Sequence, residues 1–116
     1  MQLKRKAEGI NEGEKVKVNC LNQIEYLTFP ALEKLGIVRH LFSTRYGGVS
    51  EGIYTSMNLS YARGDKKENV DENYRRIADI LKSTPDKIVC SSQTHTTNVR
   101  LVTEKDCGKG IVRKLD

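Results

Sequence analysis

His95 is one of two histidines in the chain and lies in a polar segment, CSSQTHTTNV, at residues 90–99. A short apolar run precedes this segment and an alternating run follows it, which predicts that the imidazole lies on a turn between two strands. A histidine in such a position can bind a metal, or it can form hydrogen bonds within its own turn. The small polar residues around it could fix the tautomer of the ring. A zinc site would need two or three further ligands, and no second cluster of histidines or cysteines follows.

Arg45 is the second residue whose type and position indicate chemistry. It lies in the loop FSTRYGGVS at residues 42–50, where Gly47 and Gly48 permit positive φ and close approach of the backbone. The guanidinium offers a planar fork of donors that suits phosphate or carboxylate. The loop has no lysine at Walker spacing and no GxGxxG motif, so a nucleotide-binding P-loop is not supported. The residues alone leave two alternatives, an anion-binding loop and an ordinary surface loop.

Three further polar residues can be interpreted in two ways each. Asn58 lies between apolar residues, so its amide either holds backbone or reaches a ligand. Asp65 precedes the clearest helical pattern, and we expect it to cap that helix rather than to act as a catalytic acid. His40 lies in a predicted strand, and we expect it to be a partly buried structural histidine.

The three cysteines are widely spaced and odd in number, which fits neither a zinc ribbon nor a disulfide framework. Cys20 and Cys90 are expected to be buried structural thiols, and Cys107 is expected to be exposed in a turn. A reducing cytoplasm is the simplest compartment for such a chain.

The composition is that of a globular domain, with 37% hydrophobic and 30% charged residues among 116. The formal net charge is +5, and much of the excess lies at the two ends of the chain, which favours a solvated surface over binding of nucleic acid. No apolar stretch approaches the roughly 20 residues of a membrane-spanning helix, and the N-terminus lacks the apolar centre of a signal peptide. We therefore expect neither nucleic acid nor a membrane as a partner.

The elements that position these residues follow from periodicity. Residues 1–13 are expected to form a loose N-terminal arm, and 14–116 to belong to a single domain. The strongest helical pattern covers about 66–81. Strands are predicted over 16–20, 24–28, 37–42, 88–90 and 97–103, the first two as a hairpin, with a short helix over 30–36. The fold class is therefore α+β, with a mixed sheet of short strands and one main helix.

A last strand is predicted to begin near Ile111 and is not completed before Asp116. We therefore expect the chain to be half of a larger fold. A domain divided through its sheet exposes strand edges, so self-association is also expected.

Five short motifs occur in order: FSTRYGGVS at 42–50, GIYTSMNL at 52–59, GD at 64–65, NVDENYR at 69–75 and QTH at 93–95. Together they resemble the N-terminal half of the laccase-domain family, which is also called multicopper polyphenol oxidase-like, YfiH-type or peptidoglycan-editing-factor-like. The resemblance covers roughly residues 37–111. Each motif is weak alone, but their order and spacing make the set specific.

The resemblance implies a zinc-dependent purine nucleoside phosphorylase that acts on adenosine, inosine and methylthioadenosine, with adenosine deamination as a further activity. His95 matches the first zinc ligand of the family's Gln-Val-His-Gly motif, although Thr94 and Thr96 replace its valine and glycine. The remaining ligands, a cysteine and a second histidine, would lie beyond Asp116. Copper is not expected, because the chain shows no copper-type ligand cluster.

The same resemblance implies that Arg45, Asn58 and Ser43 contact phosphate or substrate. The implied partners are a nucleoside and phosphate, in the cytoplasm. An amidase that edits peptidoglycan precursors on the same fold is one alternative. A non-catalytic binding remnant is the other, if the natural chain ends at Asp116. By itself the 116-residue chain is expected to bind metal weakly and to be a poor enzyme.

Overall fold

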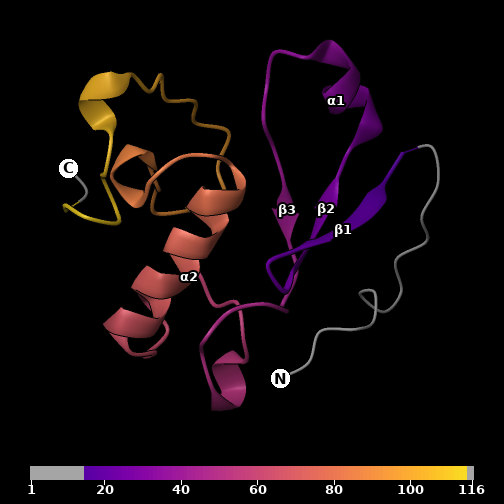
Figure 1. Cartoon of the computed structure of the whole chain (residues 1–116). Coiled ribbons are helices and arrows are strands. Elements are labelled where there is room, and N and C mark those ends of the chain that lie inside the picture. The colour runs from indigo at the N-terminus through magenta and orange to yellow at the C-terminus, as the bar shows by residue number, and fades with distance from the viewer. Residues whose placement is uncertain (1–14, 115–116) are drawn as a thin grey trace.

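The computed structural model describes residues 15–114, so the arm predicted at 1–13 lies outside the described residues. A three-stranded antiparallel sheet, ordered β1-β2-β3, lies on one side of the molecule and helix α2 on the other (Figure 1). The elements are β1 Lys17–Leu21, β2 Ile24–Thr28, α1 Pro30–Leu35, β3 Phe42–Ser43 and α2 Lys67–Ile80, with 3₁₀ turns at Gly52–Tyr54, Pro85–Lys87 and Glu104–Asp106. The predicted α+β fold with one main helix is confirmed.

The predicted hairpin of β1 and β2 is also confirmed. Its two turn residues, Asn22 and Gln23, have φ of 52° and 67°. Positive φ at both positions of a two-residue turn matches the right-handed twist of the strands that it joins. The register runs from Leu21 opposite Ile24 to Lys17 opposite Thr28. Because β3 pairs with the other edge of β2, the second strand is the centre of the sheet.

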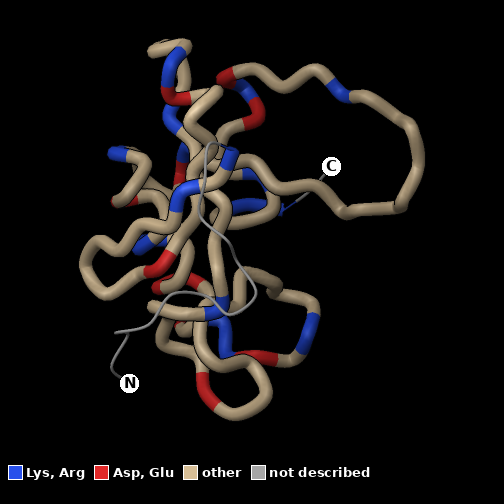
Figure 2. The backbone as a smooth tube through the Cα atoms, turned by 90° about the vertical axis from the view of Figure 1, so that its right-hand side faces the viewer, with Lys and Arg blue, Asp and Glu red and all other residues tan. Residues whose placement is uncertain are grey.

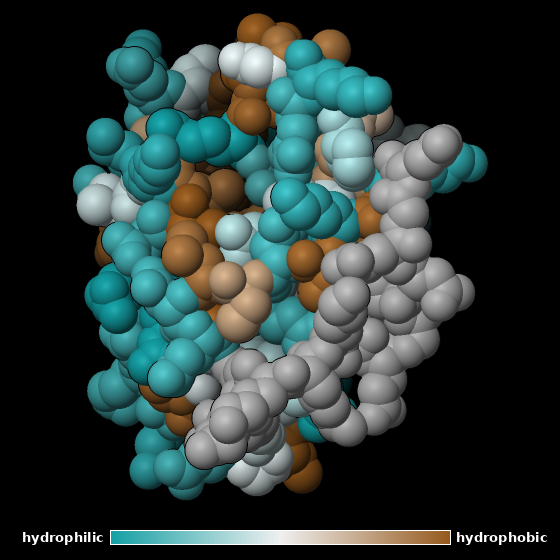
Figure 3. Space-filling view, turned by 45° about the vertical axis from the view of Figure 1, so that its right-hand side comes forward, coloured by the Kyte–Doolittle hydropathy of each residue, from teal (hydrophilic) through white to brown (hydrophobic). Residues whose placement is uncertain are grey.

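The core is small and joins three parts of the chain. Ile24 from β2, Met57 from the segment after the Gly52–Tyr54 turn, and Ile77 from α2 form the buried hydrophobic cluster. Met57 is thereby drawn between the sheet and the helix, which anchors the loop that begins at β3. Hydrophobic atoms remain exposed at several places on the face shown in Figure 3. The exposed large apolar residues include Leu35, Ile37, Phe42, Ile53, Val99 and Leu101.

Helix α2 has nearly the bounds that periodicity predicts, but its N-terminus is built differently. Lys66 occupies the N-cap position and makes no side-chain capping bond. The prediction that Asp65 caps the helix is therefore wrong. Its carboxylate instead accepts hydrogen bonds from Ser50 Oγ at 2.5 Å and Asn58 Nδ2 at 3.1 Å. The Asp65 side chain therefore binds the preceding loop and does not cap the helix. None of the helices in residues 15–114 is long and apolar enough to cross a membrane.

Several predicted strands are absent from the described residues. The strand expected at 37–42 is reduced to Phe42–Ser43, and 88–90, 97–103 and the segment from Ile111 are not strands. A strand needs a neighbour for its backbone N–H and C=O groups, and alternation alone does not provide one. Val99 and Leu101, which set the pattern in 97–103, are 96% and 87% exposed.

Candidate functional site

The loop that carries His95 lines a pocket of about 700 Å³. Figure 2 shows this loop, residues 91–103, standing away from the rest of the backbone. His95 is exposed and has a φ of 54°, in the left-handed region that few residues other than glycine adopt. The turn predicted at this residue is therefore confirmed, whereas the strands predicted on either side of it are not.

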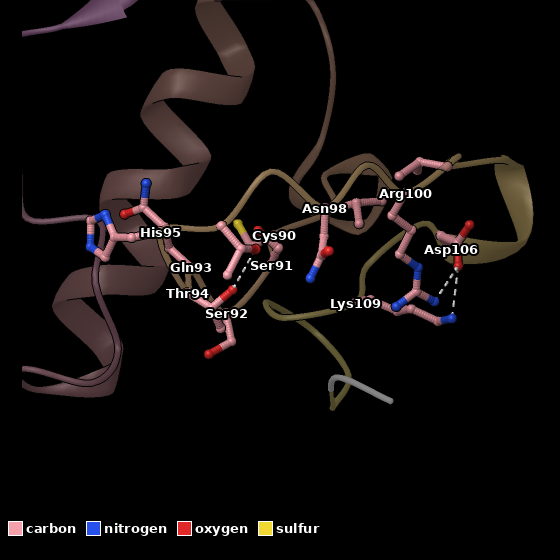
Figure 4. A pocket seen from close by; sticks show the side chains of 13 residues that line it. Cys90, Ser91, Ser92, Gln93, Thr94, His95, Asn98, Arg100, Asp106 and Lys109 are labelled. Atoms are coloured by element: carbon pink, nitrogen blue, oxygen red, sulfur yellow. Dashed lines mark hydrogen bonds and ion pairs between the residues drawn. The ribbon is translucent and has the colours of Figure 1, made fainter.

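Charged residues lie at the opposite end of this pocket from His95 (Figure 4). Asp106 accepts a hydrogen bond from Lys109 Nζ at 2.7 Å and lies 3.7 Å from Arg100 Nη2. Hydrogen bonds, first from Lys109 and then from the Thr103 backbone, hold the pKa of Asp106 below its usual value. One ionised carboxylate therefore faces two cations at this end.

The polar neighbours of His95 do not orient its ring. The hydroxyls of Thr94 and Thr96 lie 3.2 Å apart and bond to each other. Among residues 15–114, no hydrogen bond reaches the imidazole of His95, so the prediction that its neighbours fix the tautomer is wrong. The ring is consequently accessible to a ligand from solvent.

Metal binding through these residues alone would be incomplete. In the described part of the chain, no group of three or more His, Cys, Asp and Glu side chains is placed to hold a metal ion. A catalytic zinc takes three protein ligands and keeps one open position. Residues 15–114 therefore offer His95 as a single exposed nitrogen ligand and do not form a zinc site by themselves.

A second pocket, of about 360 Å³, contains Arg45. Its Nη2 lies 3.5 Å from the carbonyl oxygen of Thr55, and the residue is exposed. The lining residues are Arg45, Ile53, Tyr54, Thr55, Met57, Asn58 and Arg63. The structure thus brings Arg45 and Asn58 together, as the sequence predicts, and adds a second arginine that the sequence analysis did not single out.

Asn58 uses its amide to shape the wall of this pocket. Its Nδ2 donates to the carbonyl of Ser60 at 3.2 Å and to Asp65 Oδ2 at 3.1 Å, and its Oδ1 accepts from the Ser60 backbone at 3.1 Å. Hydrogen bonds from Ser50, Asn58 and the Lys66 backbone lower the pKa of Asp65, which therefore stays ionised at neutral pH. The sequence leaves two roles open for Asn58, and the structure shows the one in which its amide forms hydrogen bonds with the backbone, here that of Ser60.

Asn73 organises the same loop from helix α2, and the sequence analysis missed it. It is 0% exposed. Its Nδ2 donates to Ser50 Oγ at 2.9 Å and to the carbonyls of Asn58 at 2.8 Å and Ser56 at 3.3 Å. The available signal was its spacing, because Asn73 falls between Val70 and Ile77 on the buried stripe, where an amide must find internal partners.

Ser43 and His40 have structural positions. Ser43 lies opposite Tyr26 in the sheet and is not among the residues that line either pocket. His40 Nε2 accepts a hydrogen bond from the Phe29 backbone at 2.8 Å, and its ring stacks on Phe29 at a centroid distance of 5.8 Å. The prediction that His40 is structural is confirmed, although it lies outside a strand.

The cysteines differ from expectation. Cys20 is exposed rather than buried, because β1 is an edge strand, and Cys107 is half-buried rather than exposed. Cys90 is half-buried, with its Sγ 3.4 Å from the hydroxyl of Tyr74. Tyr74 also donates to the carbonyl of Leu59 at 2.5 Å, and burial raises its pKa, so the phenol remains protonated. Tyr74 therefore ties the start of the His95 loop to α2.

Arg45 and His95 thus line two pockets that have no residue in common. The 3₁₀ turn Gly52–Tyr54, which contributes to the Arg45 pocket, lies toward one end of α2 and the His95 loop toward the other (Figure 1). Arg45 and Asn58 line one pocket, whereas His95 lines the other and Ser43 lines neither.

The sequence and this fold define a family. A model of the multi-copper polyphenol oxidoreductase laccase family matches residues 39–116, which is more than half of the chain. The chain belongs to this family.

Three relatives place it more closely. A purine nucleoside phosphorylase of Corynebacterium glutamicum is 43% identical over 67 residues, which are 58% of this chain and 27% of the relative. The crystal structure of YfiH of Bacillus licheniformis matches 80% of this chain and 33% of its own, with a TM-score of 0.70 and 29% identity. YlmD from Geobacillus stearothermophilus matches 74% of this chain and 32% of its own, with a TM-score of 0.68 and 31% identity. The chain spans about a quarter to a third of the length of these relatives.

Proposed function

We propose that this chain is the N-terminal part of a purine nucleoside phosphorylase, which cleaves adenosine, inosine or methylthioadenosine with phosphate. The observation that carries the proposal is the 43% identity to a relative named purine nucleoside phosphorylase, within a family to which the chain belongs. The arginine pocket supports it, because phosphorolysis requires a site for a phosphate dianion.

The proposed role of Arg45 is to bind that phosphate. In phosphorolysis a phosphate oxygen forms a bond to C1′ of the ribose, while the bond from C1′ to the purine nitrogen breaks and the purine leaves with the electron pair and takes up a proton. A guanidinium can hold the phosphate through two parallel hydrogen bonds and fix its direction of attack. Asn58 contributes by holding the wall of the pocket through Ser60 and Asp65.

We also propose zinc as the cofactor, with His95 as one ligand. Its exposed imidazole suits a zinc ligand, and the remaining ligands would come from outside residues 15–114. When bound, zinc would polarise an oxygen of the substrate or of water. The reaction then requires that the pockets of His95 and Arg45 open toward the same nucleoside, because phosphate has to reach C1′.

The test uses the protein isolated from its natural source, whose intact mass shows how much of the relatives' length it has. Release of purine base from the three nucleosides is followed by chromatography, with and without phosphate. We expect release only with phosphate, and a fall in kcat/KM of about 10-fold or more in Arg45→Gln, because a hydrogen bond to a charged group is lost.

Arg39→Gln is the matched control, because Arg39 is exposed and lines neither pocket. It removes the same charge and should leave kcat/KM unchanged. Base release that does not depend on phosphate would indicate hydrolysis and contradict the proposal, as would an equal loss in Arg45→Gln and Arg39→Gln.

A further inference from the structure

Arg63 is the second arginine of the Arg45 pocket, and it comes from a different part of the loop. The two residues are 18 positions apart in the sequence, yet both line the same cavity of about 360 Å³. That volume lies near the lower end of the range for small-molecule pockets, about 300–1,000 Å³. The cavity therefore suits a small anion or a small anionic metabolite.

The backbones of the two arginines are tied to one short segment, Tyr54 to Met57. The carbonyl of Arg45 accepts hydrogen bonds from the backbone N–H groups of Ser56 at 2.8 Å and Met57 at 2.9 Å. The carbonyl of Arg63 accepts from the Tyr54 hydroxyl at 2.6 Å. Because the backbones of both arginines are held to the same segment, their side chains start from fixed positions in the wall of one pocket, which lowers the ordering cost of binding.

The charge of the pocket is positive. Two arginines and no acidic residue are among the residues that line it. Within residues 15–114, no ion pair involves either guanidinium. The acid nearest to Arg63 in the sequence is Asp65, and its carboxylate accepts hydrogen bonds from Ser50, Asn58 and the Lys66 backbone. A cleft lined by charge of one sign attracts the opposite charge.

We infer that Arg63 and Arg45 together form an oxyanion site that grips one phosphate group between two guanidinium forks. The ligand is inorganic phosphate or the phosphate of a sugar 1-phosphate, and the choice of phosphate rests on the proposed function. Two forks that approach from different parts of the loop can bind different oxygens of one tetrahedral anion, which a single arginine cannot do. Arg63 is thereby assigned to ligand binding.

The test measures binding of inorganic phosphate and of ribose 1-phosphate to the full chain by titration calorimetry at low ionic strength. Arg63→Gln and Arg45→Gln should each weaken binding by about 10-fold or more, because a charge-assisted contact is lost. Arg63→Lys keeps the charge but not the fork, so it should fall between wild type and Arg63→Gln. Arg39→Gln is the control for net charge and should bind as wild type does.

Arg63-dependent binding of either ligand supports the inference, and the ligand that binds more tightly identifies the source of the phosphate. Binding to neither ligand overturns it, and so does Arg63→Gln binding as tightly as wild type, or Arg39→Gln weakening as much. Arg45→Gln and Arg63→Gln both replace exposed side chains, and unfolding curves confirm that the proteins compared are folded. Arg63-dependent binding without any phosphorolysis by the natural protein would contradict the proposed function and leave the oxyanion site standing.

Discussion

The side-chain oxygen of Asn73 accepts a hydrogen bond from the backbone N–H of Val49 at 2.8 Å, which connects the middle of helix α2 to the loop that contains Gly47 and Gly48. The amide nitrogen of the same residue donates to Ser50 and to the carbonyl of Asn58 on the far side of that loop. One buried amide thus binds both the segment at Val49 and Ser50, which follows Arg45, and the segment at Asn58.

Asn73→Ala should lower the free energy of unfolding by about 2–4 kcal/mol, because each buried polar group left without a partner costs roughly 1–3 kcal/mol. Chemical denaturation measures the change. Asn98→Ala is the control, since Asn98 is exposed and should change stability by less than about 0.5 kcal/mol. Equal stabilities of the two variants would show that the hydrogen bonds of Asn73 do not stabilise the loop.

Gly48→Ala should disrupt the same loop through packing. An added Cβ would lie 2.6 Å from Met57 Cα and even closer to the Ser56 carbonyl oxygen, and backbone cannot yield as a side chain can. We expect a loss of about 2 kcal/mol or more. Gly52→Ala separates this clash from backbone strain, because φ is 63° there but nothing lies within 4 Å of the added carbon. It should cost about 1–2 kcal/mol. A thermal or urea unfolding series in which Gly48→Ala is the milder variant would contradict this account.

Glu72→Gln should change how stability depends on pH. Hydrogen bonds from Arg75 and then Arg76 lower the pKa of Glu72 to about 2. The folded protein therefore holds the proton of Glu72 less tightly than the unfolded chain, so this carboxylate stabilises the fold above its unfolded pKa of about 4.3 and loses that effect as pH falls toward 2. Arg76 also donates to the Gly47 carbonyl at 2.8 Å, which connects the pair to the loop.

The stability difference between wild type and Glu72→Gln should consequently be largest above about pH 5, at about 0.5–1 kcal/mol, and disappear near pH 2. Urea unfolding at pH 7, 4 and 2.5 measures it. Glu68→Gln is the control, because Glu68 is an exposed acid on the same helix that forms no ion pair among residues 15–114. A difference that grows as the pH falls would have the wrong sign for this mechanism.

His95→Ala and His40→Ala should have opposite effects on metal content and on stability. Under the proposed function, His95→Ala abolishes retention of zinc by the natural protein and leaves the unfolding midpoint nearly unchanged, since His95 is exposed. His40→Ala leaves the Phe29 N–H without its acceptor and should cost about 1–3 kcal/mol without loss of zinc. Elemental analysis and calorimetry on the same samples measure both properties. Zinc that is retained by His95→Ala would remove His95 from the ligand set.

Local patterns in the sequence predict the hairpin, the short helix and α2 well, because each depends on residues that are close in the chain. Turn residues fix the hairpin at Asn22 and Gln23, and an apolar stripe fixes α2. The strand predicted at 97–103 fails for the opposite reason, since strand pairing depends on a distant neighbour that alternation cannot reveal.

The site shows the same division between local and distant information. The turn at His95 and the shared pocket of Arg45 and Asn58 agree with the expectations from the motifs. The structural roles of Asp65 and Asn73 do not follow from the sequence, because each has a partner far back in the chain: Ser50 lies 15 residues before Asp65, and Val49 lies 24 residues before Asn73. Hydrogen bonds across such separations depend on how the helix packs on the loop, and the spacing of residues in the sequence gives little indication of them.

Arg45 and His95 line two pockets that share no lining residue. Effects of such residues on stability should add in a double variant. A departure from additivity in kcat/KM would therefore not arise from direct contact between the side chains. Under the proposed function, it would measure the coupling that a nucleoside creates when it binds across both pockets.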